Sequence, residues 1–127
     1  MSKQPQWQPI SKLSLIAHHI DSMLQAVQEQ YKLLLSAKVR LHALDTYIVN
    51  RVKEVTTSQQ DDLWIFDTQL VLWLSGKLTQ EQRIEVERLV EQMTKLQEQM
   101  TAILILVDDL KKGTIEKVLG KGDAEPG

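Results

Sequence analysis

The sequence predicts an all-α protein, an up-down antiparallel bundle of three long helices. Apolar residues recur at alternating steps of three and four over most of the chain, as they do on the buried face of a helix. Only five glycines and three prolines occur in 127 residues, and no glycine precedes residue 76, whereas β-turns draw heavily on both residue types. The hydrophobic content of 43% and charged content of 25% are typical of one globular domain.

The clearest helical pattern covers residues 80 to 112. Thr79 and Gln82 have the spacing of a capping box, in which each side chain bonds the backbone N–H of the other residue. Eight apolar residues then follow at steps of three and four: Val86, Leu89, Met93, Leu96, Met100, Ile103, Val107 and Leu110. Gly113 comes directly after this seam and predicts its stop.

Two shorter helices are predicted at residues 12 to 36 and 45 to 75. Both carry apolar residues at helical spacing. In the second helix, Thr57 and Gln60 have the spacing of another capping box, which leaves open a break near Ser58 and a bundle of four helices. The predicted core contains residues from all three helices: Ile16, Ile20, Val27, Val52, Phe66, Leu70, Val86, Leu89, Met93, Met100 and Ile103.

The chain is expected to form one domain with an extension at each end. The divisions are an extended arm at 1 to 10, the helical bundle at 11 to 119 with a short C-terminal helix at 115 to 119, and a disordered tail at 120 to 127. Trp7 is the anchor of the arm. We expect Trp7 to fold back onto the bundle because large aromatic side chains favour burial; the alternative is a docking peptide for a partner.

No strong catalytic or metal-binding motif is present. His18 and Asp21 lie three residues apart on one predicted helical face, a spacing that supplies two metal ligands, but the sequence assigns no third. His19 and His42 have no assignable partner. Whether His18 and Asp21 bind a metal is left open.

The acidic pairs and the cysteine content give no further candidate for a catalytic or metal site. The pairs Asp61 with Asp62 and Asp108 with Asp109 diverge by about 100° on a helix, a poor arrangement for gripping one small cation. The absence of cysteine excludes disulfides and thiolate sites. We therefore expect no cofactor and no enzymatic activity, with an enzyme that uses an unrecognised carboxylate or metal site as the third hypothesis.

Nucleic-acid binding has one candidate surface, a basic patch formed by Lys38, Arg40, Arg51 and Lys53. Such binding requires a basic stripe, and four cations on a chain of formal net charge −2 do not make one. A DNA-associated regulatory or accessory protein is therefore the alternative hypothesis and not the leading one.

Self-association is predicted from apolar residues that one bundle cannot cover. Residues 63 to 74 and 103 to 107 are apolar in nearly every helical direction, and a large exposed apolar patch is unusual on a monomer. A two-fold dimer is the commonest way to cover one. The candidate residues are Trp64, Ile65, Leu72, Trp73 and Leu104. The alternative is that the connection 37 to 44 and Trp7 cover this surface.

The leading functional hypothesis is a non-catalytic helical protein-protein interaction or accessory protein that forms a homodimer and binds a protein partner the sequence does not identify. No apolar run reaches the roughly 18 residues of a membrane span, so no membrane insertion is expected. The N-terminus lacks the apolar core of a secretory signal. The expected location is the cytoplasm.

Overall fold

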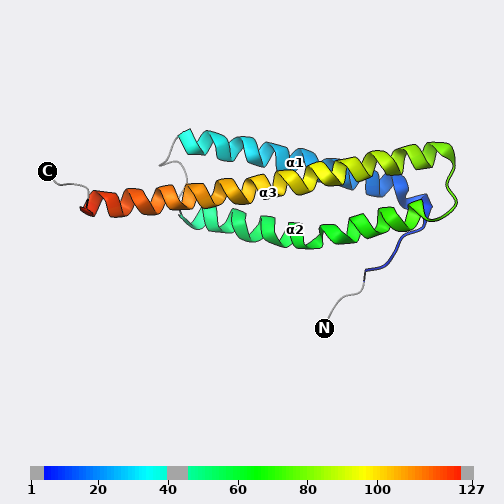
Figure 1. Cartoon of the computed structure of the whole chain (residues 1–127), viewed down its shortest axis with the longest axis horizontal. Helices are drawn as coiled ribbons and strands as arrows, with labels where there is room; N and C mark the ends of the chain where they lie inside the picture. The colour runs from blue at the N-terminus through cyan, green and yellow to red at the C-terminus, as the bar shows by residue number, and fades with distance from the viewer. Residues whose placement is uncertain (1–4, 40–45, 124–127) are drawn as a thin grey trace.

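The chain folds as three long helices packed side by side. The computed structural model describes residues 5–39 and 46–123, with side chains described at 5–37 and 46–112. A 3-10 turn, η1 (Ile10–Lys12), precedes the helices α1 (Leu13–Val39), α2 (Thr46–Leu74) and α3 (Gln80–Asp123). Successive helices run antiparallel (Figure 1), and no strand occurs in the described ranges. The predicted all-α bundle is confirmed.

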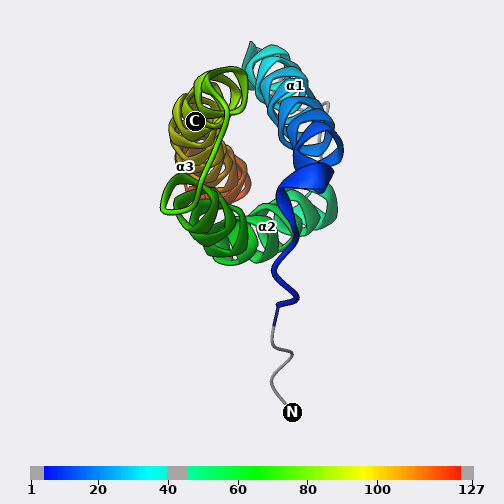
Figure 2. The same cartoon turned by 90° about the vertical axis from the view of Figure 1, so that its right-hand side faces the viewer.

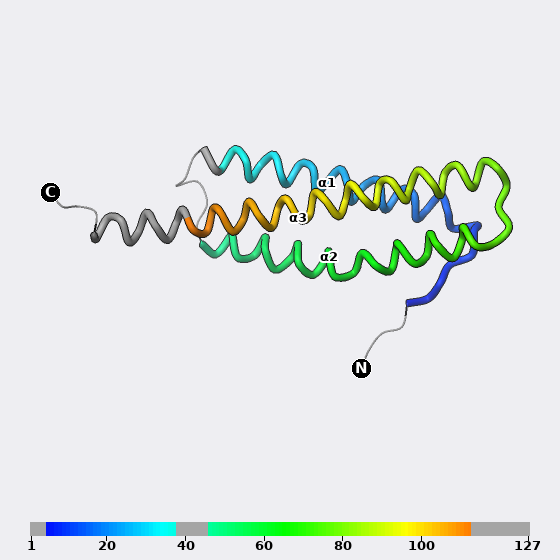
Figure 3. Tube along the Cα trace, viewed as in Figure 1, coloured from blue at the N-terminus to red at the C-terminus, as the bar shows by residue number. Residues whose placement is uncertain are grey.

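The helix α3 is the central element of the bundle. It packs closely against both α1 and α2, as the trace in Figure 3 shows, and the three helices form a triangle when they are seen along the bundle in Figure 2. All eight predicted seam residues of α3 are buried. The predicted core is present, but Ile16, Val52 and Phe66 are only partly buried at its margin.

The beginning of α3 has the predicted local structure. The Gln82 N–H donates to Thr79 Oγ1 at 3.1 Å, and the Thr79 N–H donates to Gln82 Oε1 at 3.0 Å. This reciprocal pair satisfies N–H groups that have no partner within the helix. The capping box is therefore confirmed.

The helix α2 is continuous, so the alternative with a break near Ser58 does not occur. Thr57 and Gln60 therefore lie inside the helix, where no cap is needed, and Gln60 Nε2 donates to Thr101 Oγ1 of α3 at 3.0 Å. Thr56 is buried in the seam of α2. Thr and Ser have weak helix propensities, and each costs about 0.5 kcal/mol in a helix relative to alanine. Packing against α3 outweighs this cost.

The predicted stop at Gly113 is wrong. The helix α3 continues through Gly113 to Asp123, so the predicted short helix at 115 to 119 is part of α3, and residues 120 to 123 are helical. A glycine inside a helix costs about 1 kcal/mol relative to alanine and does not by itself end the helix. The remainder of the predicted tail, 124 to 127, lies outside the described residues.

Candidate functional site

The helix α2 carries a second apolar stripe on its outward side. Trp64, Thr68, Val71 and Leu72 fall at positions i, i+4, i+7 and i+8, the spacing of one helical face, and Ile65 lies beside them. Trp64, Val71 and Leu72 are exposed, and Trp64 keeps 50% of its surface in solvent. The segment that is apolar in nearly every direction thus divides into a buried seam and an exposed stripe.

The register between α2 and α3 extends this stripe onto α3. Gln60 bonds Thr101, and Lys53 Nζ lies 3.3 Å from Asp108 Oδ1, so the opposed pairs are seven residues apart on both helices. Eleven residues beyond Gln60 is Val71, and eleven residues before Thr101 is position 90. Val90 is an exposed valine. It therefore lies level with Val71 on the neighbouring helix.

Trp7 adds the N-terminal arm to this surface. Its ring meets that of Trp64 edge to face, with centroids 6.4 Å apart and planes at 72°. The prediction that Trp7 folds back is confirmed. With the arm in place, Trp64 remains 50%, Val71 61% and Leu72 43% exposed, so Trp7 borders the stripe without covering it. We name the resulting surface the tryptophan face and define it by six residues: Trp7, Trp64, Ile65, Val71, Leu72 and Val90.

The arm is attached to α2 by two buried side chains, Gln69 and Trp73, which we call the arm clamp. The Gln8 N–H donates to Gln69 Oε1 at 2.6 Å, and the Gln8 carbonyl accepts from Gln69 Nε2 at 3.3 Å and Trp73 Nε1 at 2.9 Å. Gln69 is 4% and Trp73 6% exposed. Leaving such buried groups unpaired would cost about 1–3 kcal/mol each, so the arm completes the end of the bundle.

The five predicted self-association residues occupy three environments. Trp64, Ile65 and Leu72 share the tryptophan face. Trp73 points inward and bonds the arm. Leu104 is half-buried on α3 between Thr101 and Asp108, level with an earlier part of α2 than Trp64.

Sequence reasoning did not name Val71, Val90 or Gln69, and it did not find the contact of Trp73 with the arm. Val71 lies one heptad after Trp64, a signal that the sequence contains. Gln69 is a polar residue within an apolar run, which also marks a special environment. Val90 could be found only from the register between two helices.

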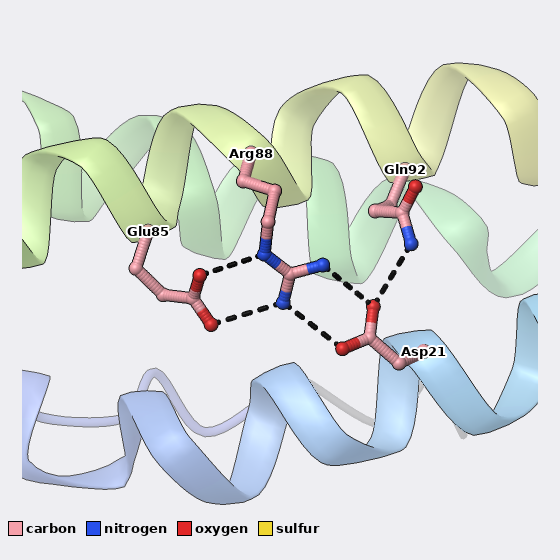
Figure 4. A network of polar contacts seen from close by, with 4 residues as sticks. All are labelled: Asp21, Glu85, Arg88 and Gln92. Carbon is pink, nitrogen blue, oxygen red and sulfur yellow. Dashed lines mark hydrogen bonds and ion pairs between the residues drawn. The ribbon is translucent and has the colours of Figure 1, made fainter.

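A polar network joins α1 to α3 (Figure 4). Arg88 donates to Glu85 Oε1 at 2.7 Å and Oε2 at 3.0 Å, and to Asp21 Oδ1 at 3.0 Å and Oδ2 at 2.9 Å. Gln92 Nε2 also donates to Asp21 Oδ1 at 3.0 Å. One guanidinium thus binds two carboxylates bidentately, the strongest geometry for such a pair.

The network shifts the pKa values of its three ionisable groups. Hydrogen bonds from Arg88 hold the pKa of Asp21 and of Glu85 below their usual ranges, although partial burial acts in the opposite direction. The bonds to Glu85 and to Asp21 raise the pKa of Arg88. Outside this network, partial burial raises the pKa of Asp67 on α2.

These contacts also define the surroundings of the histidines. Arg88 and Gln92 bond both oxygens of Asp21, and His18 only adds a weak attraction that lowers the Asp21 pKa. His19 stacks on Phe66 of α2, with centroids 5.3 Å apart. Among the described residues, no three His, Asp or Glu side chains converge to hold a metal ion. His42 lies outside the described residues.

We expect the Arg88→Met variant to lose stability in a pH-dependent way. Asp21 and Glu85 have lowered folded pKa values, so their contribution is present above the unfolded pKa, about 4, and is lost as pH falls through the folded pKa. Because all three side chains are more than one-third exposed, the loss at pH 7 should be about 1 kcal/mol. Urea unfolding at pH 7 and at pH 2.5 measures this difference.

The matched control is Arg83→Met, because Arg83 lies on the same helix and makes no ion pair with any residue whose side chain is described. Its stability should stay within about 0.5 kcal/mol of the wild type. An Arg88→Met loss of equal size at both pH values would contradict the electrostatic role of the network.

A groove of about 280 Å³ lies between α1 and α2 and reaches Ile103 of α3. Its apolar lining includes Met23, Val27, Val52 and Val55. The volume lies at the lower limit of small-molecule sites, which span about 300–1,000 Å³. We interpret the groove as incomplete packing between α1 and α2, on the side where Val52 is only half-buried.

The predicted basic patch is only partly described. Arg51 lies 3.6 Å from Glu54, and Lys53 lies 3.3 Å from Asp108. Both described cations are therefore paired with carboxylates. The Lys38 side chain and Arg40 lie outside the described residues, as does most of the connection 37 to 44, which was the alternative cover for the apolar surface.

Within the described part of the chain, no helix combines the length and the apolar character needed to cross a membrane. Comparison of the sequence with protein-family models and with curated proteins, and of the structure with solved structures, gives no match.

Proposed function

We propose that this chain is a non-catalytic helical interaction protein that forms a two-fold homodimer through its tryptophan face. The observation that carries the proposal is the exposed apolar stripe on α2, with Trp64 at one end and Leu72 at the other. Aromatic side chains dominate the binding energy of many protein interfaces. Exposed apolar patches of this kind mark interaction surfaces.

The pattern of the stripe supports a second copy as its partner. The stripe consists of Trp64, Ile65, Thr68, Val71 and Leu72, and it is symmetric about Thr68. Trp64 and Leu72 are four residues from Thr68, and Ile65 and Val71 are three residues from it. Two α2 helices crossing antiparallel about a two-fold axis at Thr68 would place Trp64 against Leu72 of the partner subunit. Each apolar residue then meets another apolar residue, as an isologous interface requires.

The chemistry of the stripe agrees with this arrangement. None of its five residues is charged, so two copies meet without burying an ion. Thr68, at the centre, has a small side chain and lets the two helices approach closely. Further binding of an unidentified protein stays part of the proposal, because only one face is used by the dimer. No observation on the described residues favours the nucleic-acid or enzyme alternatives.

Light scattering of the Trp64→Glu variant tests the proposal. The wild-type mass should rise towards twice 14.6 kDa with concentration in the micromolar range. Trp64→Glu should stay near 14.6 kDa, because an unpaired carboxylate buried in the interface costs about 3–5 kcal/mol. The control Leu33→Glu, at an exposed position on α1, should behave as the wild type. A dimer that survives Trp64→Glu would refute this interface.

A further inference from the structure

The arm clamp recognises the backbone of the arm. A single amide side chain, that of Gln69, bonds both the N–H and the carbonyl of Gln8, and the Trp73 indole donates to the same carbonyl. The Gln8 side chain turns away and donates to the Gln6 carbonyl at 3.1 Å. This pairing resembles β-strand addition, in which a protein binds an extended peptide through main-chain hydrogen bonds and the neighbouring side chains supply the specificity.

The clamp has the properties of a built binding site. Gln69 and Trp73 are each more than nine-tenths buried. The described residues offer the polar atoms of these two side chains no hydrogen-bond partner other than Gln8. Trp73 belongs to the core cluster, and Gln69 lies four residues before it on the same helix, so the packing of α2 sets the positions of both side chains. The bundle is therefore preorganised to receive an extended chain.

The residues on either side of Gln8 define what fits. Trp7 lies against Trp64, which selects an aromatic side chain at the position before the clamped residue. Pro9 follows, with the extended backbone of φ −69° and ψ 159°. Since only the backbone of Gln8 is read by the clamp, the central residue is not specified. The recognised pattern is Trp-x-Pro in an extended conformation.

We propose that Gln69, Trp73 and Trp64 form a binding site for an extended Trp-x-Pro peptide, and that residues 7–9 are its resident, displaceable ligand. A tethered arm acts at an effective concentration of roughly millimolar. An external peptide therefore binds well only when the arm is released. The clamp itself lies inside one chain and needs no dimer, whereas Trp64 belongs both to this site and to the proposed dimer face.

The test uses a fluorescent peptide with the sequence of residues 5–12 and measures anisotropy with the full-length chain. The Trp7→Ala, Gln8→Pro double variant removes the aromatic anchor and the N–H that donates to Gln69. We expect this variant to bind the peptide at least ten-fold more tightly than the wild type does. Adding Gln69→Leu should abolish the gain. The control Gln8→Ala should match the wild type, because it keeps both backbone groups.

Three results would overturn the proposal: equal binding by the wild type and the double variant, a gain that persists with Gln69→Leu, or arm-dependent dimerisation without binding of the free peptide. The last result would make the arm of a second copy the occupant. Circular dichroism checks that the variants keep their helices.

A measurement on the wild type covers the case in which the double variant does not fold. Millimolar peptide should shift the Trp7 indole resonance in ¹⁵N NMR spectra and leave the bonded Trp73 indole in place. An unchanged Trp7 resonance would also overturn the proposal.

Discussion

Replacing Leu96 by alanine should lower the free energy of unfolding by about 2–5 kcal/mol. Leu96 is fully buried on α3, in the core that α3 shares with α1 and α2. In a bundle of three helices, no further layer lies behind the core to move into the space. The expected loss of stability therefore has two contributions, the lost burial of the side chain and a cavity that closes only partly. Urea unfolding followed by circular dichroism measures the loss.

The control for this prediction is Leu33→Ala, which makes the same chemical change at an exposed position on α1. Its effect should stay within about 0.5 kcal/mol. Similar losses for both variants would mean that α3 is not the centre of the core.

Replacing Trp73 by alanine should cost about 3–5 kcal/mol. The side chain is buried at the end of the bundle, and its indole N–H also holds the Gln8 carbonyl at 2.9 Å. Trp73→Phe separates the two contributions, because it keeps most of the ring volume but removes the donor; this variant should cost about 1–2 kcal/mol. Thermal unfolding of the two variants measures the difference.

Trp64→Ala is the matched control for Trp73→Ala, because the half-exposed Trp64 should contribute less than about 1 kcal/mol to the stability of a single chain. The stabilities of the two variants should be compared at protein concentrations low enough for monomers to dominate. If Trp64→Ala proves more costly than Trp73→Ala at such dilution, the assignment of the inward and outward faces of α2 is wrong.

Much of the fold could be predicted from local patterns. The seam of α3 has a strict period, and a residue on such a seam has one direction in which to be buried. The capping box of Thr79 and Gln82 involves neighbours in the sequence, so it needs no knowledge of the tertiary structure.

The errors arose where tertiary contacts decide between local alternatives. Gln60 bonds Thr101 across to α3 and does not cap a new helix. The end of α3 was misplaced at Gly113, since glycine ends a helix only if the chain turns away there.

The candidate site was only partly predictable. The apolar residues 63 to 74 indicated two neighbours for α2, and Trp64, Ile65 and Leu72 do share its outward face. Trp73 lies nine residues after Trp64, so the sequence places the two rings on opposite sides of the helix. It did not show that the Trp73 side is enclosed by the core and the arm, which removes Trp73 from the exposed face. Contacts that connect residues about sixty positions apart, such as Gln8 with Gln69, leave no periodic signal.

Oxidative crosslinking of a Thr68→Cys variant tests the proposed dimer most directly. The chain has no cysteine, so the introduced thiol can react only with its copy in a second chain. A two-fold axis at Thr68 would bring the two Cα atoms within the roughly 4.4–6.8 Å that a disulfide spans. Mild oxidation should therefore give a reducible species of twice 14.6 kDa at micromolar concentration. Ser22→Cys, exposed on α1, should remain mostly monomeric, and a Thr68→Cys variant that crosslinks no faster than Ser22→Cys would contradict the account.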